Sequence, residues 1–360
     1  MAGEGTPVTL EDARAGIGSM VANGVFEPVS TYLDTPTYGL APAESVAAVA
    51  AALDEWREGT ANMDAYDGAV NRSRQLFARI VDAPVSSVAV GAQVSAMVGP
   101  VAASVADGAT VLAPEGDFTS LLFPFLVQAH RGVTVRTVPL EHLADAVAPD
   151  VDVVAFSLVQ SSSGRMVDAE AVRVAAADHG ALTVVDATHA AGWLPFSAAD
   201  FDVAVAAAYK WLLCPRGAAF ATFRAEVMDR ITPVNAGWYA GEEPWNTIYG
   251  TPLRLAASAR RFDISPAWFS WVGAVPSLEL LASLGVEAIH DHNVGLASAL
   301  RSALDLEPSG SAIVKLEGVD PSRLSGAGIT AAVRADSIRT GCHVYNTSAD
   351  VDALVDALAG

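Results

Sequence analysis

The chain has 360 residues, of which 52% are hydrophobic and 17% charged, a balance typical of a folded protein with a large core rather than a disordered one. Its 41 acidic and 21 basic residues give a formal charge of -20, which repels phosphate backbones and argues against a nucleic acid partner. Two cysteines are too few for a disulfide framework, and neither a signal peptide nor a membrane-length apolar run is evident, so a cytoplasmic location and no membrane association are expected.

The first elements predicted along the chain are helices. Residues 8–26 combine a capping-box spacing with helical periodicity and predict a short leading helix. Residues 32–42 are rich in Thr, Pro and Gly and predict an extended piece that turns into a loop. A helix over residues 45–59 ends at a glycine, which is a common C-terminal stop, and a second helix covers residues 66–80.

A strand, one glycine and a helix follow at residues 87–104. The β-rich word SVAV gives way at Gly91 to a helix, and the free backbone amides at such a helix start can hold an anion. Neither GxGxxG nor GxxxxGK[ST] is present, so a dinucleotide fingerprint and a P-loop are both unsupported. The same turn is also an ordinary connector, and local sequence alone leaves both interpretations open.

The middle of the chain alternates apolar runs with helices or loops. Five runs have strand composition, namely ATVLAP, DVVAFSLV, LTVVDA, FDVAVAAAYK and AAFATFR. This alternation predicts an α/β fold with a doubly wound, mostly parallel sheet.

Two ionisable residues, Asp186 and Lys210, stand where two of these runs finish. In an open α/β sheet the ligand crevice lies outside the carboxyl ends of the strands, so both side chains would share one edge. Pyridoxal phosphate (PLP) chemistry needs this pair, because a lysine binds the aldehyde as a Schiff base and a carboxylate keeps the pyridine nitrogen protonated. The alternative is a solvated strand-end lysine beside an unrelated aspartate.

The words DATHAAGW and YKWLLCPRG resemble the class V aminotransferase superfamily of fold type I PLP enzymes, which includes cysteine desulfurases, kynureninases and isopenicillin N epimerase-like proteins. The resemblance implies a large domain with a mostly parallel, doubly wound sheet and a smaller α+β C-terminal domain. Residues 31–255 would form the large PLP-binding domain and residues 256–360 the small domain. Residues 1–30 would be an N-terminal segment associated with the small domain.

The resemblance also implies a set of cofactor contacts. Lys210 would carry the Schiff base, Asp186 would pair with the pyridinium nitrogen, and His189 would lie against the phenolic oxygen. Tyr209 falls where kynureninase-like members bind the phosphate. The phosphate cradle would be the turn after Gly91, and the aromatic residue of the word DFTS would stack on the pyridine ring; these candidates are Ala92, Gln93, Val94 and Phe118. Phe123 and Phe125 are interpreted as core residues.

Contacts with a partner subunit and with the substrate are implied as well. The aromatic segment from Trp238 to Ser265 predicts a homodimer with shared active sites, and the resemblance of its words AGWY and ARRFD implies that Trp238 and Ser265 would reach the partner's cofactor. A Trp-rich core patch is the alternative. Arg339, in the closing word IRTGCHVYNT, would hold the substrate α-carboxylate, since a guanidinium fork donates two parallel bonds. Gln160 and Ser161, in the loop QSSSGRMVD, would touch the cofactor or substrate.

A metal site is not predicted. His290 and His292 are two residues apart, so on a helix they point in different directions. The predicted function is a PLP-dependent enzyme acting on an α-amino acid, aminotransferase-like. A β-elimination or carbon–sulfur lyase is the main alternative. Desulfuration is less expected because Cys214 and Cys342 lie away from the desulfurase position, and a PLP-binding sensor or an inactive paralogue is the alternative outside enzymes.

Overall fold

A computed structural model of the chain describes residues 16–334 and 337–359. Residues 8–15 of the leading helix predicted for residues 8–26 lie outside the described residues; residues 16–17 are helical, but residues 18–24 form turns, so the predicted helix does not continue to residue 26. The predicted helices over 45–59 and 66–80 are confirmed as α2 (Ala43–Glu58) and α3 (Met63–Ile80). Gly59 ends α2 in the left-handed conformation with φ 72°, where a side chain would be strained.

The remaining elements follow in chain order. The strands are β1 (Thr31–Tyr32), β2 (Val88–Gly91), β3 (Thr110–Pro114), β4 (Thr134–Val138), β5 (Val153–Ser157), β6 (Leu182–Asp186), β7 (Val203–Ala207), β8 (Ala219–Phe223), β9 (Ile313–Glu317), β10 (Ile329–Thr330), β11 (Ala332–Arg334) and β12 (Ser337–Gly341). The further helices are α4 (Val94–Ser104), α5 (Thr119–Leu126), α6 (Ala169–His179), α7 (Ala225–Met228), α8 (Trp268–Leu284), α9 (Val286–Ala303), α10 (Ser322–Gly326) and α11 (Ser348–Ala359).

The large sheet has seven strands in the order β2-β8-β7-β6-β5-β3-β4. Strands β7, β6, β5, β3 and β4 run parallel, while β8 is antiparallel to both of its neighbours. The carboxyl ends of β2, β3, β5, β6 and β7 therefore share one edge. The predicted α/β fold with a mostly parallel sheet is confirmed.

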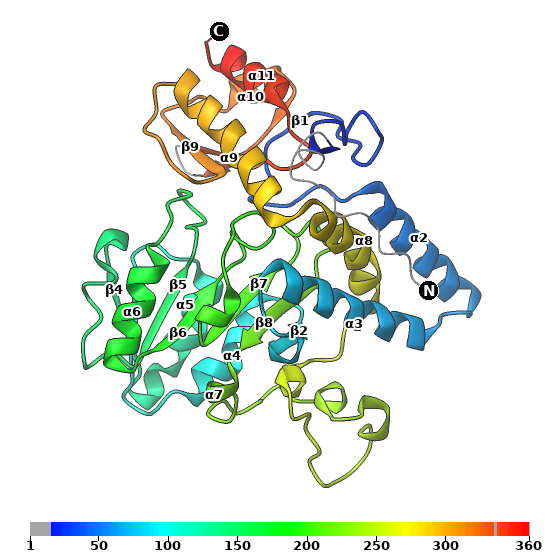
Figure 1. The fold of residues 1–360 in the computed structure, drawn as a ribbon, viewed down its shortest axis with the longest axis vertical. Helices are drawn as coiled ribbons and strands as arrows, with labels where there is room; N and C mark the ends of the chain where they lie inside the picture. The colour runs from blue at the N-terminus through cyan, green and yellow to red at the C-terminus, as the bar shows by residue number, and fades with distance from the viewer. Residues whose placement is uncertain (1–15, 335–336, 360) are drawn as a thin grey trace.

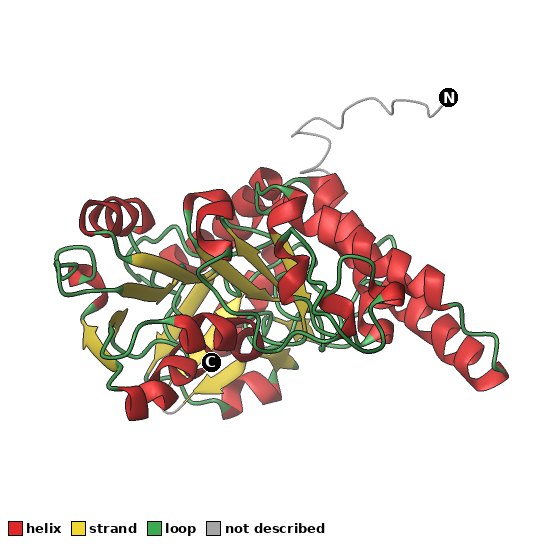
Figure 2. Cartoon of the chain, turned by 90° about the horizontal axis from the view of Figure 1, so that it is seen from below, coloured by secondary structure: helices red, strands yellow, loops and turns green. Residues whose placement is uncertain are grey.

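Helices cover both faces of this sheet, as the alternation of side chains along each strand requires. In β5, Val154 and Phe156 face the core formed with α3, α6 and α8. Val153 and Ala155 face the opposite core, which α4 and α5 close. The sheet is thus doubly wound, and Figures 1 and 2 show helices on both sides of it.

A second, three-stranded antiparallel sheet of order β11-β12-β9 lies above the large sheet in Figure 1, together with α9, α10 and α11. It has its own apolar core, in which Leu316 and Ile338 meet Leu300 of α9 and Leu354 of α11. The N-terminal stretch joins this part of the fold, since β1 pairs with β10 in parallel. The three domain boundaries remain a prediction, and residues 1–15 of the first segment lie outside the described residues.

The predicted turn near Gly285 is confirmed. Gly285 has φ 80° and separates α8 from α9, which are bent by 85° relative to each other. Among the described residues no single helix is long and apolar enough to span a membrane, and only this bent pair would pass such a test together.

One core prediction was wrong. Phe125 is fully buried, whereas Phe123 is 56% exposed. Both residues lie on α5, but positions two apart on a helix face different directions, so only one of them can face the sheet.

Candidate active site

The carboxyl edge of the large sheet brings the predicted lysine and carboxylate together. β6 and β7 are parallel neighbours, with Asp186 paired to Val205. Asp186 is the last residue of β6, and Lys210 follows β7 by three residues; both are buried. The predicted parallel pairing is confirmed and β6 ends at Asp186 as expected, whereas β7 ends at Ala207 and a short turn leads to Lys210.

The Lys210 amine is surrounded by His189 and two aromatic rings. Its Nζ lies 2.8 Å from His189 Nε2. It also lies 5.5 Å from the ring centroid of Phe118 and 5.8 Å from that of Tyr209. Phe118 is 40% exposed, so part of this side chain is accessible. The structure therefore brings together four of the residues predicted for cofactor binding.

His189 is held by two tryptophans. The indole N–H of Trp193 donates to the backbone carbonyl of His189 at 2.7 Å, and that of Trp211 donates to His189 Nδ1 at 3.3 Å. Burial lowers the pKa of His189 well below its usual range, and Arg339, together with Lys210 whenever that amine is protonated, lowers it further. His189 is thus a neutral imidazole at neutral pH.

Asp186 is a buried carboxylate at the floor of the site. Burial raises its pKa to about 6, and the nearby charge of Asp117 acts in the same direction. Hydrogen bonding to Thr188, whose amide donates to Oδ1 at 2.8 Å, opposes this rise, as does Lys210 whenever its amine is protonated. A cationic ring nitrogen bound against Asp186 would be stabilised by it.

Asp117 was not predicted from the sequence, although it lies beside Phe118 in the word DFTS. Its carboxylate accepts bonds from the Ser157 amide at 2.8 Å, the Gln160 side chain at 3.2 Å and the Phe118 amide at 2.6 Å. It thereby ties the end of β5 to the start of α5. The signal available in the sequence was a second carboxylate just after a buried strand.

The predicted substrate residues lie in one cluster. Arg339 is buried, and its guanidinium donates to the carbonyl and hydroxyl of Ser161, the latter at 3.1 Å, and to the hydroxyl of Thr37 at 3.0 Å. Thr37 belongs to the loop predicted over residues 32–42, which is packed on the lysine loop: Gly39 donates its amide to the Tyr209 carbonyl at 3.0 Å. A side chain at Gly39 would collide with the Lys210 carbonyl.

The predicted phosphate cradle has the expected strand–turn–helix form. Ala92 and Gln93 connect β2 to α4; Gln93 is the N-cap residue with an exposed side chain, and Val94 begins the helix. Ser265 follows Ile264, whose amide donates to the Val90 carbonyl at 3.3 Å, so it lies near the end of β2.

Trp238 lies farther along the same Trp-rich segment. It belongs to a 3-10 helix (Trp238–Ala240) in the yellow-green loops at the bottom of Figure 1. Its ring centroid lies 5.1 Å from that of Trp245. Asp67 of α3 anchors the segment, because its carboxylate accepts bonds from Trp245 at 3.0 Å and from Tyr239 at 3.2 Å. A contact of Trp238 or Ser265 with a partner's cofactor remains a prediction.

A second basic side chain, besides that of Lys210, lies over the ring of Tyr209. The guanidinium of Arg216 lies 4.6 Å from the centroid of the Tyr209 ring, and the Tyr38 ring lies 5.7 Å from it. Neither Arg216 nor Tyr38 was singled out from the sequence. The predicted phosphate-side residue Tyr209 thus lies in a locally positive, aromatic environment.

The donor set fits PLP. A buried carboxylate could balance the charge of a protonated pyridine nitrogen, a neutral imidazole and a lysine amine lie in contact, and a partly exposed aromatic ring lies beside the amine. No cluster of three or more potential metal ligands occurs within residues 16–334 and 337–359. His290 instead stacks on Trp193 with ring centroids 5.8 Å apart, and His292 bonds the Asn346 carbonyl at 3.0 Å.

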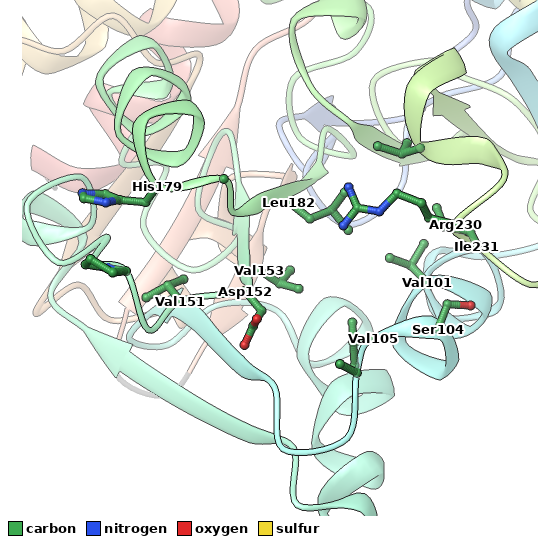
Figure 3. Close-up of a pocket in the computed structure, with 14 residues that line it drawn as sticks. Val101, Ser104, Val105, Val151, Asp152, Val153, His179, Leu182, Arg230 and Ile231 are labelled. Carbon is green, nitrogen blue, oxygen red and sulfur yellow. The ribbon is translucent and has the colours of Figure 1, made fainter.

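A cavity of about 350 Å³ lies elsewhere, at the amino ends of the strands (Figure 3). Val153 and Leu182, the first residues of β5 and β6, line it together with Val105, which precedes β3. Figure 3 shows Arg230 projecting across this cavity. Because the predicted site residues lie at the opposite ends of the same strands, this cavity is not the predicted cofactor site.

Comparison with known proteins agrees with this geometry. The family model described as aminotransferase class-V matches residues 60–325. The chain is 28% identical over 312 residues to an uncharacterized aminotransferase, YcbU, of Bacillus subtilis, covering 80% of this chain and 82% of that protein. It is 27% identical over 335 residues to isopenicillin N epimerase of Amycolatopsis lactamdurans, covering 79% and 83%.

Solved structures share the fold. The cystine C–S lyase C-DES, in complex with its reaction product cysteine persulfide, superposes with a TM-score of 0.82 at 19% identity, covering 92% of this chain and 97% of that one. A C-DES mutant with glycine covalently linked to the PLP cofactor gives a TM-score of 0.83 at 18% identity, covering 96% and 98%.

Proposed function

The chain belongs to the class V aminotransferase family and is a PLP-dependent enzyme, and we propose that it transaminates an α-amino acid with Lys210 as the cofactor-binding residue. The observation that carries the proposal is the 2.8 Å contact between the Lys210 amine and His189, beside the buried carboxylate of Asp186. A lysine that contacts a neutral imidazole in a desolvated pocket is suited to bind a carbonyl group.

The roles of the side chains follow from their positions. PLP, when bound, supplies an electron sink for the bonds at the substrate Cα. Asp186 would stabilise the positive charge on the ring nitrogen, and Phe118 would cover one face of the ring. The Lys210 amine would move the Cα proton as the basic group of the site.

Arg339 would orient the substrate. Its guanidinium is held by Ser161 and Thr37, so its fork is fixed before a carboxylate arrives. The orientation of the α-carboxylate sets which bond at Cα is broken. Gln160, bound to Asp117, would complete this wall of the site.

A β-elimination or carbon–sulfur lyase is the second candidate. The similarity of the fold to the cystine C–S lyase C-DES supports it. The roles assigned to Lys210, Asp186 and Arg339 are the same in both reactions, because proton removal from Cα precedes both outcomes.

We also propose an oligomeric state and a location for the enzyme. We infer a homodimer in which Trp238 and Ser265 contribute to the partner's site, and a cytoplasmic location. The large exposed aromatic and aliphatic side chains of the 245–253 loop, which include Tyr249 and Leu253, support an interface there.

The test is a substrate panel with two product assays. Purified, PLP-loaded protein is incubated with each α-amino acid, and keto acid and sulfide are measured together. Keto acid formed only in the presence of an amino acceptor supports transamination; acceptor-independent keto acid with ammonia or sulfide would establish the lyase. Borohydride reduction should fix the cofactor on the peptide that carries Lys210, and a colourless protein that takes up no PLP would refute the proposal.

A further inference from the structure

We propose that Trp211 is a positioning residue: its indole N–H, donated to Nδ1 of His189, keeps the imidazole proton on Nε2, the nitrogen that faces Lys210. The tautomer follows from this hydrogen bond and from the burial that keeps His189 neutral. Its use in the reaction rests on the function proposed above.

The indole of Trp211 is the donor in its contact with His189. An indole N–H can only donate a hydrogen bond, so the nitrogen that receives it must offer a lone pair. Trp211 Nε1 lies 3.3 Å from His189 Nδ1, which is therefore unprotonated. A neutral imidazole carries one proton, and His189 is neutral because burial lowers its pKa well below the usual range. The proton must be on Nε2.

The position of this proton determines which group donates the hydrogen bond between His189 and Lys210. With a proton on His189 Nε2, the 2.8 Å contact to Lys210 runs from imidazole to amine, and the Lys210 Nζ accepts. An amine accepts only with a free lone pair, which is the neutral, nucleophilic form. The same Nε2–H is the donor that the predicted contact between His189 and the phenolic oxygen of the cofactor requires.

Trp211 is itself fixed in place. It is fully buried, and its ring lies between Trp193 and His343, with centroids 5.4 Å from each. Its backbone carbonyl accepts a bond from His343 Nε2 at 2.9 Å. A side chain at Gly192, which has φ 102°, would come within 2.6 Å of that carbonyl, so the loops that carry His189 and Trp211 can approach this closely only with glycine there.

The neighbouring Trp193 provides a matched control. Its indole N–H also donates to His189, but to the backbone carbonyl rather than to the ring. Trp193→Phe and Trp211→Phe each remove one indole N–H from a fully buried tryptophan bonded to the same histidine. Only Trp211→Phe removes a bond to a ring nitrogen.

The test is nitrogen NMR of the full-length protein labelled with ¹⁵N-histidine, near pH 8, with and without PLP. Protonated and unprotonated nitrogens of a neutral imidazole give well-separated signals, and the spectrum of His189→Gln identifies those of His189. We expect His189 in the wild type to be protonated at Nε2 in both forms. Trp211→Phe should populate the Nδ1-protonated tautomer, whereas Trp193→Phe should keep the wild-type tautomer.

A second measurement links the tautomer to the site. In the PLP-loaded enzyme, Trp211→Phe should slow the reaction of the bound cofactor with an amino acid by about tenfold, the value of one hydrogen bond, and should shift the pH dependence of the cofactor's visible absorbance. If Trp211 had a purely structural role, Trp211→Phe would lower stability but would change neither the nitrogen NMR signals of His189 nor the pH dependence of the cofactor's absorbance.

Two results would overturn the inference. One is a wild-type His189 protonated at Nδ1, which needs no variant and so remains decisive if Trp211→Phe does not fold. The other is an unchanged tautomer in a folded Trp211→Phe protein. Failure of the proposed function would look different, because a protein that binds no PLP would still report the tautomer of its cofactor-free form.

Discussion

Asp117 is hydrogen-bonded to the residue that pairs with Asp186 in the sheet. The Asp117 carboxylate accepts a bond from the Ser157 amide at 2.8 Å, and Ser157 is the partner of Asp186 in the β5–β6 ladder. Two buried carboxylates therefore occupy the same edge of the sheet. Burial and this like charge together raise the pKa of Asp186 to about 6. The site thus has a strong affinity for one positive charge at Asp186.

This pKa predicts how stability depends on pH in the cofactor-free protein. A carboxyl group whose pKa is raised on folding binds more protons in the folded state, so stability falls as pH rises between its unfolded value and about 6. Asp186→Asn cannot ionise, and its amide oxygen can still accept the Thr188 amide. As the pH rises from 4 to 7, the free energy of unfolding of the variant should therefore increase relative to that of wild type by on the order of 2 to 3 kcal/mol.

Urea unfolding across this pH range measures the effect. Asp107→Asn is the control, because the side chain of Asp107 is 78% exposed in its ion pair with Arg131. Its free energy of unfolding should follow that of wild type within about 0.5 kcal/mol at every pH. Stability curves that run parallel for Asp186→Asn and wild type would contradict the raised pKa.

The cysteines are predicted to have no covalent role. Burial raises the pKa of the Cys342 thiol to about 12 and that of Cys214 above its usual range, so both stay protonated and unreactive at neutral pH. Cys214→Ala and Cys342→Ala should each leave turnover within about tenfold of wild type. Turnover is to be measured together with sulfide release and thermal stability. A folded variant that loses a sulfide-producing reaction would make desulfuration the leading function.

Much of the active-site edge could be predicted from the sequence, because it follows from strand periodicity. The apolar runs that end at Asp186 and near Lys210 are consecutive strands, and consecutive parallel strands are usually neighbours. Their carboxyl ends then meet without any further information. Lys210 and Asp186 were found in this way, and the family resemblance added His189 and Phe118.

Other parts of the site depend on contacts between residues far apart in the sequence. Asp117 binds Ser157 and Gln160, 40 and 43 residues later, and no local pattern shows that a carboxylate after a strand will accept these bonds. The bond from Trp211 to His189 depends on the direction of one indole ring. The exposure of Phe123 depends on which side of α5 faces the sheet.

The homodimer prediction can be tested at the exposed loop around Tyr249 and Leu253, which are 86% and 80% exposed in the single chain. If a partner covers this loop, a double substitution of both residues by Asp places two charges in an apolar interface and should dissociate the dimer. Leu306→Asp is the control, because Leu306 is an exposed leucine that follows α9 in another part of the fold.

Sedimentation at micromolar concentration, with PLP bound, measures the result. The wild type and Leu306→Asp should have the mass of two chains, and the double variant the mass of one. A wild-type protein with the mass of a single chain would rule out the dimer and, with it, the proposed roles of Trp238 and Ser265 in a partner's site.

Variants of Arg339 distinguish a role of this residue in substrate binding from a role in folding. Its guanidinium is held by Thr37 and Ser161, so the fork can meet a carboxylate without reorganising. Arg339→Lys keeps the charge and loses the fork, and Arg339→Ala loses both. Amino acids should lose on the order of 2 to 4 kcal/mol of transition-state binding in both variants. Amines that lack the carboxylate never use the contact and should react as they do with wild type.

The measurement is the rate at which the bound cofactor reacts with an amino acid and with its decarboxylated amine. Arg301→Lys is the matched control: Arg301 is also a buried arginine, but it donates to the backbone carbonyls of Ser311 and Ile313 and has a structural role. Any effect of Arg301→Lys should therefore be equal for the two substrates. Equal losses in the Arg339 variants would mean that Arg339 likewise supports the fold, because a carboxylate-binding residue must discriminate between a substrate that has the carboxylate and one that lacks it.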